Sequence, residues 1–112
     1  MDTFQPETPV SAPAASGLVE NVTYDEIAIG RSASLSRVLD HKDIELFARV
    51  SGDTNPAHLD AGYAAETIFK TVIGHGIWSA SIVSAVLGTC LPGPGTIYLS
   101  QDLKFRRPVR PG

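Results

Sequence analysis

The hydropathy pattern is dominated by a long uncharged stretch, because no charged residue occurs between Lys70 and Asp102. Within it, residues 77–87 are apolar or small on every side of a helical projection, which predicts a helix that other parts of the protein must surround. A membrane span needs about 20 apolar residues in succession. Glycines, serines, His75 and Pro92 interrupt this run. We therefore expect a central helix of a globular domain and no membrane partner.

Alternation of apolar and polar residues predicts two strands. In residues 96–105 every second residue is apolar, except at Gln101. A period of two is typical of a strand with one buried face. Residues 32–39 alternate in part and predict a second strand. The Pro-Gly-Pro-Gly segment at 92–95 separates the central helix from the longer strand. The apolar side of that strand would carry Ile97, Leu99, Leu103 and Phe105.

Two shorter helices are predicted before the central one. Asp40 is a good N-cap residue for a helix that Gly52 would end. Its apolar or small face follows the helical spacing of i, i+3, i+4 and i+7. Asp60 can cap a second helix over residues 61–69. The face of the first helix consists of Ile44, Phe47, Ala48 and Ser51.

These elements predict an α+β fold in which an antiparallel sheet curls around the helix at 77–87. One long strand and one less regular strand cannot enclose a helix, because a stable sheet usually has more strands. We therefore expect the natural protein to continue beyond Gly112 with further strands. The domain would cover residues 18–112 and be truncated at its C-terminal end.

Composition narrows the class of protein. Residues 1–17 are rich in proline, alanine and serine, lack the apolar core of a signal peptide and predict a disordered tail. The formal net charge of −3 gives no support for a nucleic-acid partner, which usually requires a basic patch. Cys90 is the single cysteine and cannot form an intrachain disulfide. A reducing, cytoplasmic location fits best.

The chemistry is concentrated in residues 51–58, which read Ser-Gly-Asp-Thr-Asn-Pro-Ala-His. Gly52 and Pro56 rule out one continuous helix, so Asp53 and His58 would be presented from a bent loop. A carboxylate beside an imidazole is a common pair for activating water. An ordinary structural role is also open, in which Asp53 and Asn55 make turn hydrogen bonds and His58 is a packed loop residue.

A second candidate lies at the start of the central helix, in Gly74-His75-Gly76. The helix start has no acidic cap, so its first N–H groups lack evident side-chain partners. Such N–H groups suit a developing oxyanion, and Gly76 would allow a close approach. The glycines could equally serve only a tight turn before a core helix. Downstream, Arg106, Arg107 and Arg110 could contact a phosphate or simply be solvated.

The order Gly52-Asp-x-Asn-Pro-x-His58, then His75-Gly76, then an apolar helix resembles the MaoC-like, (R)-specific enoyl-CoA hydratases of the hot-dog fold. The resemblance runs from about Tyr24 to Gly112. It is closest to the N-terminal domain of bifunctional enoyl-CoA hydratase/phosphate acetyltransferase proteins. It implies a hot-dog domain, a homodimer or higher homo-oligomer and, from the bifunctional members, a fused phosphate acetyltransferase domain.

The resemblance also implies a reaction and roles for residues. Water would add reversibly, with syn geometry, to a trans-2-enoyl-CoA and give an (R)-3-hydroxyacyl-CoA. Asp53 and His58 would activate the water, with neither singled out as the base. No cofactor is expected, since coenzyme A belongs to the substrate. Bulky Trp78 near the pocket suggests short acyl chains. Oxyanion or substrate-binding roles fall to Gly76, Asn55, Ser84 and His75, with Asn55 shaping the loop and Ser84 matching a family serine.

Three alternatives remain open at this point. The domain could bind acyl-CoA and assemble a fusion enzyme without catalysis. It could be a thioesterase of the same fold, which would release a free thiol. Asp53, His58 and His75 could instead hold a zinc ion with one open position, although the expected reaction needs no metal.

Overall fold

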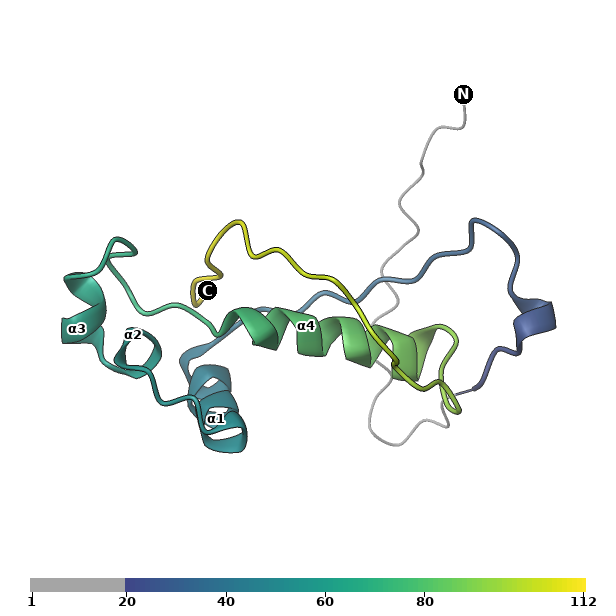
Figure 1. Cartoon of the computed structure of the whole chain (residues 1–112), viewed down its shortest axis with the longest axis horizontal. Helices are drawn as coiled ribbons and strands as arrows, with labels where there is room; N and C mark the ends of the chain where they lie inside the picture. The colour runs from purple at the N-terminus through teal and green to yellow at the C-terminus, as the bar shows by residue number, and fades with distance from the viewer. Residues whose placement is uncertain (1–19) are drawn as a thin grey trace, which may run out of the picture. The chain divides into compact units, whose positions relative to one another are not determined.

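A computed structural model describes residues 20–112 of the chain, and the predicted tail at 1–17 lies outside these residues (Figure 1). The described part forms two compact units. One contains the described residues up to Ser36 together with 81–101, and the other contains residues 37–80 and 102–112. In chain order the elements are η1 (Tyr24–Glu26), α1 (His41–Ser51), α2 (Pro56–Leu59), α3 (Ala61–Ala65), α4 (Gly76–Ala85) and the π-helical turn η2 (Val86–Cys90).

Helix α1 forms as its sequence predicts. The Asp40 side chain accepts a hydrogen bond from the backbone N–H of Asp43 at 2.7 Å, and the Asp43 side chain accepts one from the Asp40 N–H at 3.2 Å. This reciprocal capping box satisfies two backbone donors that a helix start would otherwise leave free. Gly52 ends the helix in the left-handed conformation, with φ of 79°, and its N–H donates to Ala48.

Helix α2 corrects the prediction of a bent loop from Gly52 to His58. Pro56 occupies the first turn, where its missing N–H costs nothing, and the Asn55 side chain accepts from the N–H of Ala57. His58 therefore lies on a helical turn rather than in a loop. Helix α3 begins after the Asp60 cap, as predicted, but ends at Ala65 instead of continuing to residue 69.

The unit of residues 37–80 and 102–112 holds the buried core. Its apolar members are Leu39, Ile44, Ala48, Ala64, Val72 and Ala80, and His75 is buried with them at 2% exposure. A Cβ on Gly74 would stand only 2.5 Å from the Leu39 side chain. Glycine at position 74 therefore lets the segment before α4 pass directly over this core.

The two predicted strands are absent from the part of the chain that the structure describes. Residues 32–39 and 96–105 have no strand assignment. Ladder pairing needs a neighbouring strand along the whole length of the strand. These two ranges make only isolated backbone bonds, such as Gly112 N–H to the Leu39 carbonyl at 2.9 Å. Ile97 and Leu99 are consequently 76% and 89% exposed.

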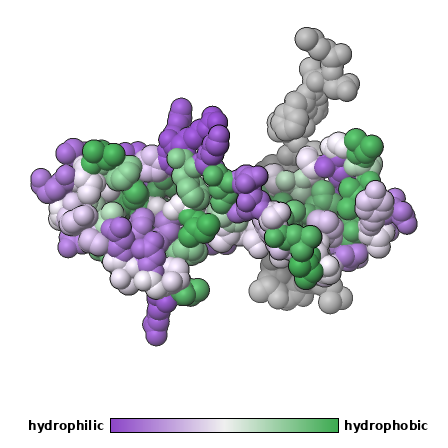
Figure 2. Space-filling view, viewed as in Figure 1, coloured by the Kyte–Doolittle hydropathy of each residue, from purple (hydrophilic) through white to green (hydrophobic). Residues whose placement is uncertain are grey.

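Helix α4 is correspondingly uncovered within residues 20–112, contrary to the expectation that it is surrounded. Ala80 is its one buried residue, whereas Ile77 and Val83 are 51% and 43% exposed. Hydrophobic surface is visible among the polar regions in Figure 2. No helix in residues 20–112 combines the length and the apolar character required to cross a bilayer.

In the other unit, residues 21 and 22 form hydrogen bonds to the Pro-Gly-Pro-Gly segment at 92–95. The N–H of Val22 donates to Pro92 at 2.7 Å, and the Asn21 amide donates to the Pro94 carbonyl. At η1 the N–H of Thr23 donates to the Glu26 carboxylate at 2.8 Å. This bond lowers the pKa of Glu26 from its ordinary value.

Candidate active site

The loop between α1 and α2 fixes the direction of the Asp53 carboxylate. Its Oδ1 accepts a hydrogen bond from the N–H of Asn55 at 3.2 Å, and the N–H of Asp53 donates to Ser51 Oγ at 3.1 Å. The Asn55 side chain in turn caps the N–H of Ala57 at 2.9 Å. The turn bonds foreseen for Asp53 and Asn55 are therefore present. They leave Oδ2 of Asp53 free for other chemistry.

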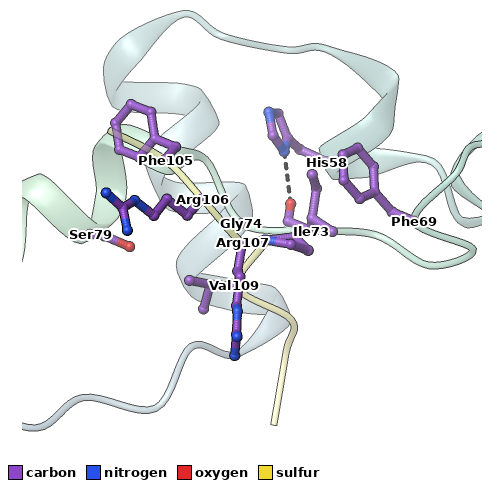
Figure 3. A pocket seen from close by; sticks show the side chains of 11 residues that line it. His58, Phe69, Ile73, Gly74, Ser79, Phe105, Arg106, Arg107 and Val109 are labelled. Atoms are coloured by element: carbon purple, nitrogen blue, oxygen red, sulfur yellow. Dashed lines mark hydrogen bonds between the residues drawn. The ribbon is translucent and has the colours of Figure 1, made fainter. Parts of the chain in front are cut away.

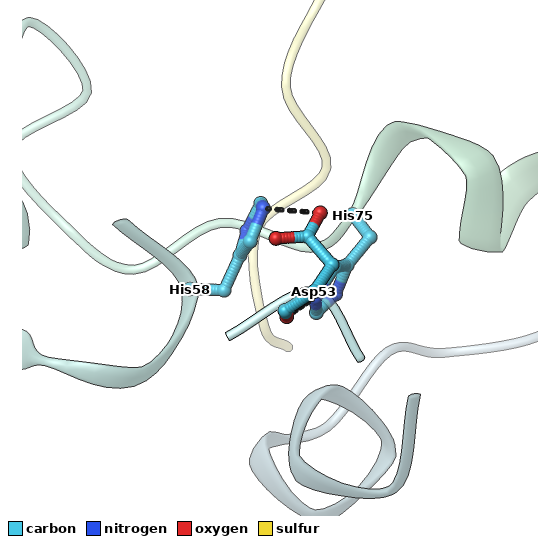
Figure 4. A group of neighbouring side chains, drawn as sticks. All are labelled: Asp53, His58 and His75. Carbon is cyan, nitrogen blue, oxygen red and sulfur yellow. Dashed lines mark hydrogen bonds and ion pairs between the residues drawn. The ribbon is translucent and has the colours of Figure 1, made fainter. Parts of the chain in front are cut away.

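His58 points its Nε2 at that free oxygen. Its Nδ1 lies 2.7 Å from the Ile73 carbonyl, which can only accept, so Nδ1 carries the proton. Nε2 lies 3.9 Å from Oδ2 of Asp53 (Figure 4). This separation is too long for a direct hydrogen bond. The imidazole side chain is 12% exposed and the carboxylate side chain 52%, so a small molecule could reach both from the carboxylate side.

His75 lies beneath this pair. Its Nε2 donates to the backbone carbonyl of Asp53 at 2.9 Å. Its ring stacks on the ring of His58, with the two centroids 3.8 Å apart and an angle of 25° between the ring planes. The centroid of the Phe47 ring lies 5.0 Å from that of His75. Its Nδ1 has no hydrogen-bond partner among the residues that the structure describes.

The same three residues bring one ligand atom each within 4.8 Å of one another, as a metal site would require. Their orientation fits a metal poorly. Zinc needs nitrogen lone pairs that converge on one point about 2.0–2.1 Å away. The rings of His58 and His75 are stacked, so their in-plane lone pairs run in neighbouring planes instead of meeting.

A cavity of about 310 Å³ opens beside His58 (Figure 3). His58, Gly76 and Ser79 contribute to its wall, while Asp53, His75 and Trp78 do not. Most of the remaining side chains are apolar, as in sites for small organic ligands. Sequence reasoning missed this wall because its members lie far apart along the chain. They are Phe69, Ile73, Gly74, Phe105, Arg106, Arg107, Pro108 and Val109.

Gly76 begins α4 at the edge of this cavity, on the side of the Phe105 ring. A Cβ at position 76 would stand 3.1–3.2 Å from three atoms of that ring. The first N–H groups of a helix have no partner within it. Of those in α4, the N–H of Trp78 donates to the His75 carbonyl at 3.0 Å, while Gly76 and Ser79 line the cavity. A site for negative charge at this helix end is chemically reasonable.

Ser84 and Arg110, both predicted as candidates from the sequence, do not line this cavity. Ser84 is exposed and belongs to the part of α4 in the unit of residues 81–101, and its role stays a prediction. The Arg110 guanidinium donates to the Phe69 carbonyl at 3.3 Å. Arg106 and Arg107 line the cavity and are exposed, as expected for solvated arginines, and a contact with phosphate stays a prediction.

Residues 22–112 match the protein family described as MaoC like domain. The chain belongs to this family. It is 56% identical over 89 residues to an (R)-specific enoyl-CoA hydratase from Rhodospirillum rubrum, covering 80% of this chain and 62% of that protein. It is 46% identical over 89 residues to a 3-hydroxybutyryl-CoA dehydratase from Methylorubrum extorquens, covering 80% and 57%.

A solved structure of an unliganded R-hydratase from Pseudomonas aeruginosa matches with a TM-score of 0.80 and 52% identity. The match covers 84% of this chain and 61% of that one. The MaoC-like chain therefore has the hot-dog fold class of these hydratases. It spans about six tenths of the length of these relatives. The predicted kinship to a phosphate acetyltransferase fusion stays a prediction.

Proposed function

We propose that the protein containing this chain catalyses reversible syn hydration of a trans-2-enoyl-CoA to an (R)-3-hydroxyacyl-CoA. The observation that carries the proposal is the pair of Asp53 Oδ2 and His58 Nε2, held 3.9 Å apart with His58 on the wall of an apolar cavity. The hydratase and dehydratase names of relatives at 46–56% identity support the same reaction.

The tautomer of His58 supports a particular division of labour. Because Nδ1–H is held by the Ile73 carbonyl, the lone pair is on Nε2. A water lying against both residues donates one hydrogen to the carboxylate of Asp53 and the other to Nε2. As the water oxygen bonds to C3, His58 takes the second proton. It then returns this proton to C2 from the same face, so one imidazole accounts for the syn geometry.

The thioester oxygen gains negative charge when C3 is attacked. In the proposal the N–H of Gly76 receives this oxygen, assisted by the positive end of the α4 dipole. Removing one such donor costs about 3–4 kcal/mol of transition-state stabilisation in known enzymes. Asn55 acts indirectly, because its N–H holds Oδ1 of Asp53 and its side chain begins the turn that carries His58.

The proposed assembly is argued from the apolar side chains that are exposed in residues 20–112. We propose that residues 96–105 pair with further strands in the assembled protein, so that an antiparallel sheet wraps around α4. A homodimer or higher homo-oligomer, as the family resemblance implies, would cover further apolar surface. Mass measurement of the full-length protein in solution tests this, and a strict monomer would oppose it. Acyl-CoA as sole substrate besides water, no cofactor, a cytoplasmic location and a fused acetyltransferase domain belong to the same proposal.

The proposal is tested by turnover of crotonyl-CoA by the full-length protein. Loss of the conjugated enoyl absorbance measures hydration, and a thiol reagent measures any release of coenzyme A. We expect hydration without thiol release, abolished in His58→Ala. His41→Ala is the matched control, since His41 is exposed at the start of α1. Thiol release would favour a thioesterase, and binding of acyl-CoA without turnover would favour a non-catalytic domain.

A further inference from the structure

We infer that His75 is a positioning residue that fixes both members of the proposed Asp53–His58 pair without touching substrate. The inference rests on the proposed function and departs from the substrate-binding role that the family resemblance suggested for His75. Its starting point is burial: His75 is 2% exposed and is not part of the cavity wall.

The first constraint acts on Asp53 through its backbone. A carbonyl oxygen can only accept, so Nε2 of His75 carries the proton of the 2.9 Å bond to Asp53. Asp53 follows Gly52, whose left-handed conformation ends α1, and the Asp53 side chain is half exposed. The buried bond from His75 therefore anchors a loop residue that would otherwise depend on local turn bonds alone.

The second constraint acts on the His58 ring through its face. His58 is held at one edge by the Ile73 carbonyl, and a single hydrogen bond leaves the ring free to rock about that bond. The stacked ring of His75, 3.8 Å away, blocks this motion. Phe47 supports His75 from another side at 5.0 Å. Nε2 of His58 is thereby kept in the direction of the Asp53 carboxylate.

The two constraints use different parts of one side chain, so two substitutions separate them. His75→Phe keeps a ring for stacking and removes the donor. His75→Gln keeps an N–H donor and removes the ring. A misplacement of about 1 Å can cost about 100-fold in rate. We expect each variant to lower kcat by about 10–100-fold, with KM within about 3-fold of its original value.

A spectroscopic measurement on the unmodified full-length protein is independent of catalysis. Long-range ¹H–¹⁵N correlation spectra report which imidazole nitrogen carries the proton. We expect the Nδ1–H form for His58 and the Nε2–H form for His75. In His75→Gln the His58 ring loses its stacking partner, so its signals should shift and broaden, while in His75→Phe they should change little. The Nδ1–H form, held by the Ile73 carbonyl, should persist in both variants. His41→Phe and His41→Gln serve as controls and should change neither signals nor kcat.

The outcomes separate this inference from the proposed function. An unmodified protein that turns over substrate while both His75 variants keep its full kcat would overturn the positioning role. So would an Nδ1–H tautomer of His75 in the unmodified protein, a measurement that stands even where a variant fails to fold. If the unmodified protein shows no turnover, the proposed function fails, and the two tautomers still decide whether His75 holds the pair.

Discussion

At the scale of single residues, Asp53 serves two purposes with two oxygens. Oδ1 completes the turn by accepting from Asn55, while Oδ2 faces Nε2 of His58. The turn bonds of residues 51–58 are therefore compatible with the proposed chemical role of Asp53. The turn bonds are what leave one carboxylate oxygen free and directed at the imidazole.

Asp53→Asn separates these two purposes. The amide oxygen can still accept from the Asn55 N–H, so we expect the free energy of unfolding to change little. The charge that orients water is lost, and kcat should fall by about 100- to 10,000-fold. Asp60→Asn is the matched control, because Asp60 also accepts a backbone bond, from Tyr63 at 3.0 Å, away from the pair. Equal kcat values for the two variants would argue against a chemical role for Asp53.

Gly76→Ala tests the close contact at the start of α4. The added methyl group would lie 3.1–3.2 Å from the Phe105 ring, so the ring must shift toward the cavity. We expect KM for crotonyl-CoA to rise about 3- to 10-fold with little loss of stability. Adding Phe105→Leu should restore it. Gly88→Ala has open space around it and is the control. An unchanged KM in Gly76→Ala would show that Phe105 does not shape the substrate site.

The sequence singled out Asp53, His58, His75 and Gly76 by residue type, by spacing and by the family resemblance, and the structure places them in one unit. It could not identify the tautomers or the stacking. These depend on Ile73 and Phe47, whose apolar side chains give no signal of a polar contact or of a ring beneath His75. The sequence assigns Phe105 to the apolar side of a predicted strand and gives no signal that it lines a cavity together with residues 106–109.

At the scale of elements, local signals decided which predictions were confirmed. Helix α1 has a capping box at Asp40 and a left-handed glycine at its end, and both lie within its own sequence. A strand has no such local signals, because its backbone hydrogen bonds are made with neighbouring strands. Residues 96–105 alternate correctly yet form no strand within residues 20–112. Alternation therefore predicts that these residues favour a strand, which forms only when a second strand pairs with them.

The cap of α1 gives a prediction about stability. Asp40→Ala removes the acceptor for the N–H of Asp43 and should lower the free energy of unfolding by about 1 kcal/mol. Helix α1 carries the buried residues Ile44 and Ala48, so the loss should register in the unfolding of the whole unit. Chemical denaturation measures it, with exposed Glu45→Ala as the control for loss of a charge. A loss no larger than that of the control would mean that the cap is dispensable.

At the scale of the whole molecule, residues 20–112 carry the site but leave much of α4 exposed. The match to the R-hydratase structure covers 61% of that chain. Among the described residues, the apolar side chains of Ile77, Val83, Ile97 and Leu99 are exposed. The site residues Asp53, His58, His75 and Gly76 nevertheless lie in one compact unit, which has its own buried core. The geometry on which the proposed reaction rests is therefore contained in this one unit.

The most direct test of the central claim is the stereochemistry of the product that the full-length protein forms from crotonyl-CoA in deuterium oxide. If the Asp53–His58 pair adds the hydroxyl and the proton from one face, the product is the (R)-3-hydroxy thioester with deuterium placed syn at C2. NMR and chiral chromatography determine both centres. An (S) product, an anti addition, or a 3-hydroxy product that forms equally well in His58→Ala would contradict the account.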